Sequence, residues 1–517
     1  MKKLIYIASI FFASFAISSC DDGFEEINTN PYALTKIDAA LLFTNAQRTT
    51  DGGFWEGEQT VVQQFVNAYN TGATAGFNFN EDNDNFNAPR WNNSYPGPIK
   101  LLEQIISLTK ADATKSNLYN MSRIWKSYIF MTLVDTYGDV PYSQAGKAYL
   151  EAVFYPKYDE DKVIYEDIYN EIKAATAALD ASKGAVKEDL FFGKLAATEQ
   201  IDKWKKLGNS LLLRIGMRYS KIDQNKAKTI VQEAFRAGVI QTNSDNAYIV
   251  YNAIYNNPLN AGPRGTNPYF YYLAEPFVEQ LKTTNDPRMK YISAKYTDPN
   301  QVLALVPDTA AVKQFGFPVG YDQTSVLKVA GYRGTAGTGQ NYSQLNYSVF
   351  GSATAPVFYV TNAQTKLLLA EAAQRGWLAG LTNAQTAKEY YEAGVSASMD
   401  EYSLYPNVSS PAVSSALKNG YLSNVKVKYD ESKALELINT QYWIASLGNG
   451  AESFANFRRS GFPALSPNKY NNNLQGGFTR RFAYPNDESS RNNENYQKAV
   501  GRMGADNLTT RVFWDKQ

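Results

Sequence analysis

The stretch NLYNMSRIWKSYIFMTLVDTYGDVPYSQA, from Asn117 to Ala145, decides the fold of this chain. Its first half places large apolar residues three and four positions apart, as on one face of an amphipathic helix: Met121, Ile124, Trp125 and Tyr128. From Tyr128 to Val134 nearly every residue is apolar, so neighbours must cover the helix on most sides. Gly138 and Pro141 then end it. The sequence predicts a buried helix against which other helices pack, with side chains that belong to the core.

The composition excludes several kinds of site. The 517 residues include 51 Lys and Arg against 50 Asp and Glu, and this balance argues against nucleic acid as a partner. Histidine is absent, which excludes Ser-His-Asp catalysis and imidazole metal sites. The single cysteine, Cys20, excludes an internal disulfide and a cysteine zinc site. We assign no catalytic residue, no cofactor and no metal, although the absence of histidine does not exclude a glycosidase that uses two carboxylates. The 37 tyrosines, 27 phenylalanines and 7 tryptophans instead suit contact with polar, ring-shaped ligands.

The N-terminus has the pattern of a secretory signal. Two lysines precede an apolar run from Leu4 to Ile17. This run is shorter than the about 20 residues that a membrane-spanning helix needs. Small residues then lead to Cys20, so residues 1–19 resemble a lipoprotein signal. We expect cleavage after residue 19 and acylation of Cys20, for example with palmitate. An ordinary signal peptide followed by an unmodified cysteine is the alternative.

Further segments of helical periodicity predict a mostly α fold. The expected helices cover residues 37–49, 56–69, 161–179, 196–219 and 224–237. Their short links suggest stacked helical hairpins, although no clean tetratricopeptide repeat is visible. The sequence TNAQT occurs at residues 361–365 and again at 382–386, with threonine and glutamine at capping-box spacing. Each copy is predicted to begin one helix of a hairpin.

Two segments lack helical periodicity. The first, from Asn70 to Pro98, is a long loop of the kind that often carries function, and Trp91 and Tyr95 within it are predicted to pack rather than bind. The second, from about residue 240 to 356, is rich in tyrosine and glycine. It predicts loops with short strands at most.

The end of the central helix, DTYGDVPY at residues 135–142, resembles a signature of the SusD-like (SusD/RagB) family, the surface nutrient-binding lipoproteins of Bacteroidota. Three later stretches resemble the family's C-terminal landmarks in the same order: residues 438–463, 480–485 and 511–516. The resemblance implies one SusD-like domain over residues 20–517. It implies a helical-hairpin, tetratricopeptide-like scaffold at about 35–240 and 357–517. A loop-rich irregular subdomain carrying short strands is expected at about 240–356.

The same resemblance implies a binding protein rather than an enzyme. Such a protein is lipid-anchored at the outer membrane, exposed at the cell surface, and captures oligosaccharides for import through a SusC-like TonB-dependent transporter. A peptide ligand, as in the RagB branch, is one alternative, and a surface glycoside hydrolase with two catalytic carboxylates is another. The charged residues near the C-terminus are predicted to form structural ion pairs rather than an anion site: Arg458, Arg459 and Arg481 with Glu452 and Glu488.

The ligand site is sought where aromatic residues lie beside Asn or Arg. A sugar ring offers a C–H face to an aromatic ring, while its hydroxyls need fixed amide or guanidinium partners. One such face contributes only about 1–2 kcal/mol, so a site needs several aromatics. Three loops meet this requirement. Their residues are Trp55, Phe77, Asn78, Phe79 and Asn80 in the first, Tyr251, Tyr255, Arg264, Asn267 and Tyr269 in the second, and Tyr332, Arg333 and Tyr342 in the third.

Overall fold

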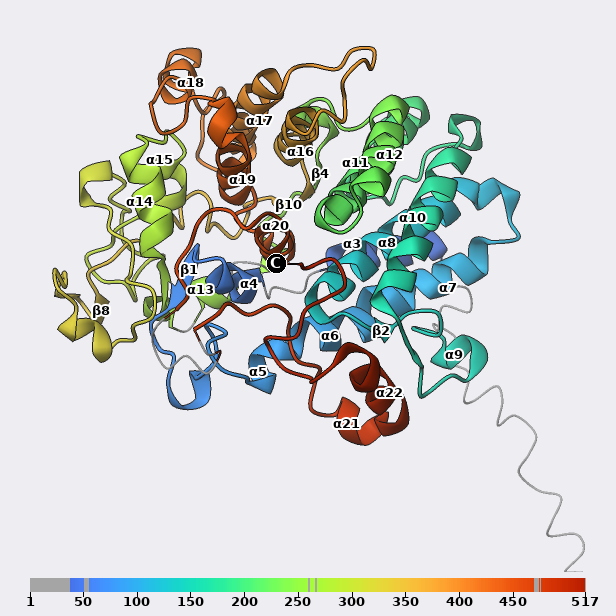
Figure 1. Cartoon of the computed structure of the whole chain (residues 1–517), viewed down its shortest axis with the longest axis horizontal. Helices are drawn as coiled ribbons and strands as arrows, with labels where there is room; N and C mark the ends of the chain where they lie inside the picture. The colour runs from blue at the N-terminus through green and yellow to red at the C-terminus, as the bar shows by residue number, and fades with distance from the viewer. Residues whose placement is uncertain are drawn as a thin grey trace, which may run out of the picture.

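The computed structural model describes residues 38–516 apart from 51–54, 259–260, 266, 469–473 and 475. The predicted signal peptide and the predicted acylation site Cys20 lie outside these ranges. Helices dominate the described chain, and loops gather at one end of the molecule around β8 (Figure 1). None of the helices within the described ranges combines the length and the hydropathy needed to span a bilayer.

The helices and strands of the described residues have the following bounds. The helices are α3 (Ala39–Arg48), α4 (Trp55–Val61), α5 (Asp84–Asn87), α6 (Pro89–Ser94), α7 (Lys100–Thr109), α8 (Ser116–Tyr137), α9 (Ala148–Glu151), α10 (Asp161–Ala178), α11 (Ala197–Arg218), α12 (Gln224–Ala237), α13 (Ala261–Arg264), α14 (Glu275–Thr283), α15 (Met289–Ile292), α16 (Asn362–Gln374), α17 (Ala387–Glu401), α18 (Ser415–Leu422), α19 (Ala434–Ala445), α20 (Gly450–Ser460), α21 (Glu488–Arg491) and α22 (Asn493–Met503). The strands are β1 (Phe65–Asn67), β2 (Val140–Pro141), β3 (Tyr158–Asp159), β4 (Ala247–Ile249), β5 (Tyr271–Leu273), β6 (Ser293–Ala294), β7 (Thr335–Ala336), β8 (Gly339–Gln340), β9 (Gln344–Leu345) and β10 (Val357–Val360).

α8 is the central helix, as the sequence predicts. Every residue from Ser127 to Tyr137 is buried, because α7, α10, α11 and α20 pack around this helix. It ends at Gly138, whose φ of 84° lies in the region that favours glycine. The Gly138 N–H donates to the Val134 carbonyl at 2.9 Å, which closes the last turn. The buried scaffold helix and its glycine end are therefore confirmed.

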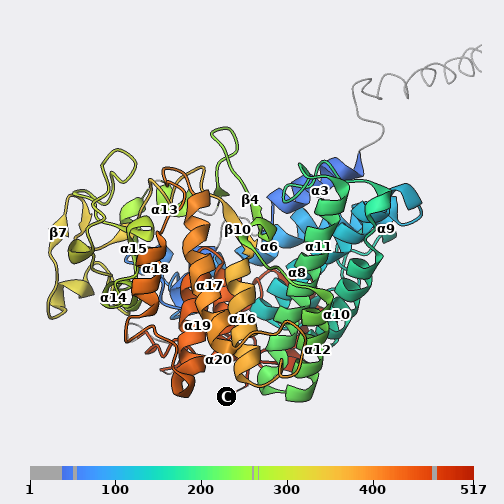
Figure 2. The same ribbon diagram turned by 90° about the horizontal axis from the view of Figure 1, so that it is seen from above.

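Helices that are close along the chain pack as pairs. α8 packs on α10, α11 on α12, α16 on α17 and α19 on α20. Figure 2 shows α16, α17 and α19 side by side. One continuous apolar core joins these helices and includes Trp125 of α8 and Trp204 of α11. The mostly α, helical-hairpin fold class is thus confirmed, and the helices predicted at 161–179, 196–219 and 224–237 are present as α10, α11 and α12.

The strands of the described residues form two-stranded antiparallel pairs: β1 with β5, β2 with β3, β4 with β10, β6 with β9 and β7 with β8. β4 and β10 stand at the two ends of the loop-rich segment, so their pairing returns the chain to the place where it left the helices. A second, small core holds Tyr272, Phe317 and Tyr342 of this segment. Loops and short strands are present as predicted, but the segment also contains the helices α13, α14 and α15, so the prediction of short strands at most is wrong there. The division into subdomains near residues 240 and 357 stays a prediction.

The predicted helix at residues 56–69 is wrong in its second half. α4 ends at Val61, and Phe65–Asn67 form β1 instead. Gln63 has a φ of 53°, a left-handed conformation that cannot continue a right-handed helix. β1 then pairs with β5, a strand far along the chain that no local pattern reveals. The segment from Asn70 to Pro98, predicted to be a loop, likewise contains the short helices α5 and α6.

Only one copy of TNAQT begins a helix. Thr361 and Gln364 form the capping box of α16, as predicted. In the second copy Asn383 has a φ of 63°, and α17 begins only after Thr386, which forms its capping box with Glu389. The prediction for this copy is wrong because the turn before α17 moves the cap from Thr382 to the last threonine of the motif.

The charged residues near the C-terminus are structural, but their partners differ from those predicted. The observed ion pairs are Arg459 with Glu371 at 2.7 Å, Arg481 with Asp506, and Glu452 with Arg218 at 2.7 Å. Arg458 donates to the backbone carbonyls of Asp135 and Arg480. Glu488 accepts a hydrogen bond from the Tyr158 hydroxyl at 2.5 Å. The packing of helices that are distant in the sequence brings these charged residues together, so spacing along the sequence does not predict the pairs.

Candidate functional site

The first predicted loop is turned inward. Phe79 is buried and stacks on Phe482, with ring centroids 4.1 Å apart. Phe77 is also buried, against Phe86 and Tyr271. These rings cannot reach a ligand in solution, so they form no part of the site proposed below.

The polar residues of this loop hold it in place. Asn78 donates from its side-chain amide to the Asn67 carbonyl and accepts from the Asn67 N–H, each at 2.9 Å. Asn80 is buried and accepts from the Asn70 amide at 2.7 Å. Trp55 begins α4, and its side chain lies outside what the structure describes.

The third predicted loop is only partly open. Tyr342 is buried, and its hydroxyl accepts from the Arg333 N–H at 3.3 Å. The Arg333 side chain is exposed and lies over the Phe315 ring at 3.6 Å from its centroid. The half-buried Tyr332 donates to the Gln340 side chain at 2.6 Å. These side chains contact one another, so the Arg333 guanidinium is the one exposed group among the three predicted residues that a ligand could contact.

The second predicted loop is divided between two places. Half-buried Tyr269 packs edge-on against Tyr69, with ring centroids 5.4 Å apart. Arg264 is half-buried and donates to the Asn257 carbonyl at 3.3 Å, and burial lowers its pKa. Asn267 is half-buried just before Pro268. Tyr251 and Tyr255, by contrast, line a groove.

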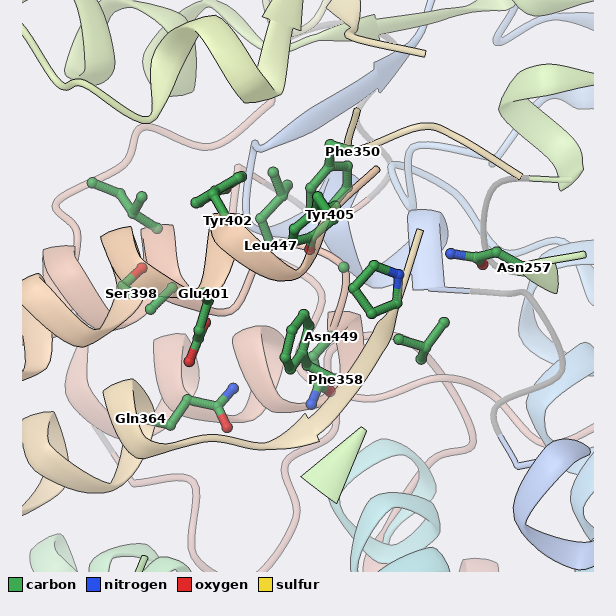
Figure 3. A pocket seen from close by; sticks show the side chains of 15 residues that line it. Asn257, Phe350, Phe358, Gln364, Ser398, Glu401, Tyr402, Tyr405, Leu447 and Asn449 are labelled. Atoms are coloured by element: carbon green, nitrogen blue, oxygen red, sulfur yellow. The ribbon is translucent and has the colours of Figure 1, made fainter. Parts of the chain in front are cut away.

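A small pocket lies between β10, α17 and α19, but it does not fit a sugar. Its volume is about 30 Å³, which is enough for one or two water molecules. Figure 3 shows Glu401 and Gln364 among its lining residues, with Tyr402 and Tyr405 above them. Burial raises the pKa of Glu401 to about 8, although hydrogen bonds from Thr361 and Asn246 oppose this shift. The cavity is a buried polar pocket of the scaffold.

The groove at Tyr255, here called the Tyr255 groove, has the size of a ligand site. Its volume is about 530 Å³, within the usual range of 300–1,000 Å³ for small-molecule pockets. It lies where α3, α6 and the loop after β4 meet. Its lining residues are Arg48, Thr49, Asn93, Pro96, Gly97, Tyr251, Ile254, Tyr255, Asn256 and Pro258.

A tight turn presents the aromatic side of this groove. The Asn252 side chain accepts hydrogen bonds from the N–H groups of Ile254 and Tyr255, both at 2.9 Å. The Asn252 N–H also donates to the Tyr255 carbonyl at 2.9 Å. Asparagine favours turns of this kind because its side chain replaces a backbone partner. The turn leaves Tyr255 61% exposed while its backbone is held by these hydrogen bonds.

The opposite side of the groove is polar. Arg48 occupies the last turn of α3, is exposed, and donates to the Asn45 side chain at 2.9 Å. Asn93 of α6 is exposed, and its amide nitrogen donates to the Pro89 carbonyl at 2.7 Å, which leaves its carbonyl oxygen as an acceptor. Tyr251 is buried, so the groove combines one open aromatic face with a cation and a fixed amide, rather than the several open aromatics expected from the sequence.

Residues 31–485 match a SusD-like family model described as "Starch-binding associating with outer membrane". The chain belongs to the SusD-like family. The family predicted from the sequence is thereby confirmed.

Solved SusD-like structures resemble this chain over nearly its whole length. A chitin-binding protein is 28% identical, with a TM-score of 0.77 over 93% of this chain and 100% of that one. A structure described as "Bacteroidetes AC2a SusD-like" is 26% identical, with a TM-score of 0.78 and the same coverage. A chitin-binding SusD homolog from Flavobacterium johnsoniae, 23% identical, shares the fold with a TM-score of 0.71 over 92% of this chain and 98% of that one. No curated protein sequence matches the chain.

Sequence reasoning found Tyr251 and Tyr255 of this SusD-like chain but missed their polar neighbours. Arg48 ends a helix whose pattern indicates only an apolar face, and Asn93 lies in a segment predicted to be a loop. Only the packing of α3, α6 and the loop after β4 brings them to one groove. An exposed Asn or Arg is common, so neither residue gave a signal in the sequence.

Proposed function

We propose that this SusD-like chain binds oligosaccharides, with the Tyr255 groove as its site. The observation that supports this most directly is an exposed tyrosine ring on a fixed turn, facing amide and guanidinium groups across a groove of about 530 Å³. A pyranose ring lies with its C–H face on an aromatic ring, and its hydroxyls accept from Arg48 or pair with Asn93 and Asn256. One aromatic face contributes only about 1–2 kcal/mol of binding free energy. The polar groups must therefore add affinity, and they also fix the orientation of the sugar.

The comparisons suggest the first ligands to test. The family description names starch. The 28% identical relative is described as chitin-binding. Oligosaccharides of glucose and of N-acetylglucosamine both offer C–H faces and hydroxyls, and the acetamido group of the second adds a hydrogen-bond partner for an asparagine amide. We therefore take maltohexaose and chitohexaose as the first two probes.

Isothermal titration of both hexasaccharides into the parent protein and Tyr255→Ala tests the site. We expect at least one probe to bind the parent and to bind the variant about tenfold more weakly, which corresponds to about 1.4 kcal/mol. Tyr321→Ala, which removes another partly exposed tyrosine, is the matched control and should bind like the parent. Equal binding by the parent and Tyr255→Ala would show that the binding site lies elsewhere. A parent that binds peptides but no glycan would overturn the proposed ligand class.

The proposed role is capture without turnover. After incubation with the protein, the hexasaccharides should be recovered intact. Release of shorter sugars by the purified protein would instead support a glycoside hydrolase. The prediction of a non-enzymatic binding protein accords with the solved SusD-like relatives described as chitin-binding.

The same proposal places the protein at the outer-membrane surface, anchored through lipid on Cys20, beside a SusC-like TonB-dependent transporter that imports the captured ligand. The family description supports the association with the outer membrane. A Cys20→Ala variant is expected to leave the membrane fraction or to accumulate unprocessed, since an acyl chain contributes about 0.8 kcal/mol per buried methylene. Normal processing with unchanged membrane partitioning would contradict anchoring at this residue.

A further inference from the structure

Three exposed aromatic residues stand together on the chain between β2 and β3. Tyr149 is 94% exposed, and Phe154 and Tyr155 are each 69% exposed. They line a groove of about 650 Å³, here called the Tyr149 groove. Large apolar side chains gathered at a concave surface indicate a binding site more often than singly scattered ones do.

The backbone beneath these rings is held firmly. The Gln144 side chain accepts from the Lys157 N–H at 2.9 Å. From the other side, Asn492 donates to the Pro156 carbonyl at 2.8 Å and Asn495 to the Tyr155 carbonyl at 3.2 Å. Because the loop is pinned at three consecutive residues from Tyr155 to Lys157, the Tyr155 ring is displayed on a fixed frame. Such a frame loses little conformational entropy when a ligand binds.

The turn that sets the direction of the rings is itself unusual. Ala152, the residue that ends α9, has a φ of 54°. A left-handed conformation is uncommon for a residue with a Cβ, and it persists only where the surrounding structure holds it. Here it separates Tyr149 on α9 from Phe154 and Tyr155 on the loop, so that rings from both segments line one groove.

The Tyr149 groove adjoins the Tyr255 groove. Pro96 lines both, and the π-helical turn Tyr95–Ile99 that contains it follows directly on α6. The two grooves therefore meet at one rigid proline rather than standing on unrelated parts of the surface.

We propose that the Tyr149 groove is a second subsite for the same linear oligosaccharide, which extends from the Tyr255 groove across Pro96. This inference rests on the proposed function. Tyr149, Phe154 and Tyr155 supply faces for successive sugar rings. Gln144 keeps its amide NH₂ group as a donor, because its bond to Lys157 uses the carbonyl oxygen, and the exposed Lys100 adds a second donor. Polar groups beside the rings suit a hydroxylated ligand.

Chain length distinguishes this arrangement from a single site. A disaccharide occupies one groove only, whereas a hexasaccharide reaches both and binds more tightly. We propose titrating chitobiose, chitohexaose, maltose and maltohexaose into the full-length protein and into a triple variant, Tyr149→Ala with Phe154→Ala and Tyr155→Ala. The three side chains are largely exposed, so their removal should leave the fold intact. The matched control removes three exposed apolar side chains of the loop-rich segment: Leu303→Ala, Val306→Ala and Val312→Ala.

We expect the triple variant to bind the hexasaccharide at least tenfold more weakly than the parent does, while the disaccharide still binds in the Tyr255 groove and the control variant behaves like the parent. Equal hexasaccharide binding by parent and triple variant would overturn the second subsite and leave the Tyr255 groove untouched. Loss of a co-purifying protein without any loss of hexasaccharide binding would also overturn it, and would assign the rings to a protein partner. A parent that binds no sugar of either length would overturn the proposed function and this inference with it.

Discussion

Asp135, the first residue of the DTYGDVPY signature, lies at a buried charge network rather than at the ligand groove. The Arg218 guanidinium, which is fully buried, contacts Asp135 at 3.2 Å and Glu452 at 2.7 Å. Trp514 donates to Asp135 from its indole N–H at 2.8 Å, and Tyr442 donates to Glu452 at 2.8 Å. The network joins α8, α11, α19, α20 and the C-terminal segment. A sequence signature of a binding family can therefore encode the scaffold.

The replacement Arg218→Met should destabilise the protein strongly. It removes the cation between two buried carboxylates, and Arg214 remains beside Glu452 but not beside Asp135. Leaving a buried charge uncompensated costs about 3–5 kcal/mol. The free energy of unfolding, measured by chemical denaturation, should fall by that amount.

The control for Arg218→Met is Arg491→Ala, which breaks an exposed pair with Asp487. Surface substitutions of this kind change stability by no more than about 0.5 kcal/mol. If Arg218→Met were no more destabilising than Arg491→Ala, the buried network would not hold these helices together.

Glu401 makes stability depend on pH. Burial raises its pKa to about 8 against an ordinary value of 4.5, so this carboxyl is neutral in the folded protein at pH 7. Its contribution to stability is full below pH 4.5 and is lost as the pH rises through 8, because the unfolded chain releases the proton first. Glu401→Gln mimics the neutral form and should remove that loss.

Denaturation of the parent and of Glu401→Gln at pH 5 and at pH 8 measures this effect. The parent should lose more stability than the variant over this interval, by a few kcal/mol at most, since one pKa unit corresponds to about 1.36 kcal/mol. Parallel stability curves for the two proteins would show that Glu401 titrates at its ordinary pKa.

At the scale of elements, the hairpins depend on close approach between helices. α16 and α17 meet at Gly394, where an added Cβ would lie 2.8 Å from Leu367 Cγ and 3.2 Å from the Leu367 backbone nitrogen. Both residues are on buried faces of their helices. A glycine inside a helix costs helical stability, so its presence here indicates that the packing distance requires it.

Gly394→Ala should therefore destabilise the protein by about 1–3 kcal/mol through overpacking, despite the better helix propensity of alanine. Gly501→Ala in α22 is the opposite case, because an added Cβ there meets nothing within 4 Å. That change should stabilise the protein by up to about 1 kcal/mol. Melting curves of both variants measure the contrast, and a shift of the same sign for both would mean that propensity outweighs packing at Gly394.

At the scale of the whole molecule, a helical part and a loop-rich part share one apolar core while a smaller core lies in the loops. Both proposed grooves lie at the segment between α6 and α7, where the loop after β4 and the loop after α9 approach it. The ligand surface thus depends on how distant segments dock, and the helices provide the fixed frame.

A stable complex with a SusC-like transporter would need a broad protein face, on the order of 1,000 Å² or more. Purification of the native protein in mild detergent should therefore bring a larger β-barrel protein with it, as band and mass analysis would show. An unrelated outer-membrane lipoprotein purified in the same way is the control and should not bring that partner. Purification of the protein alone, under conditions that preserve other outer-membrane complexes, would contradict the partnership.

The sequence by itself determined the features that local chemistry controls. The apolar run in α8, the glycine that ends it and the capping box at Thr361 depend on residues within a few positions of one another, so their patterns predict them. The same holds for the helical-hairpin fold class, and DTYGDVPY together with the ordered C-terminal stretches indicated the family, which the family model confirms.

The tertiary structure alone decided which residues face solvent and which meet. Phe79 and Tyr255 have equally suitable neighbours in the sequence, yet Phe79 is buried on Phe482 and Tyr255 is open. β1 forms because β5, far along the chain, supplies its backbone partners. Arg48 reaches the Tyr255 groove in the same way, through packing between distant segments. Exposure and contact depend on what packs against a residue, and a local pattern holds no information about a partner that is distant in the chain.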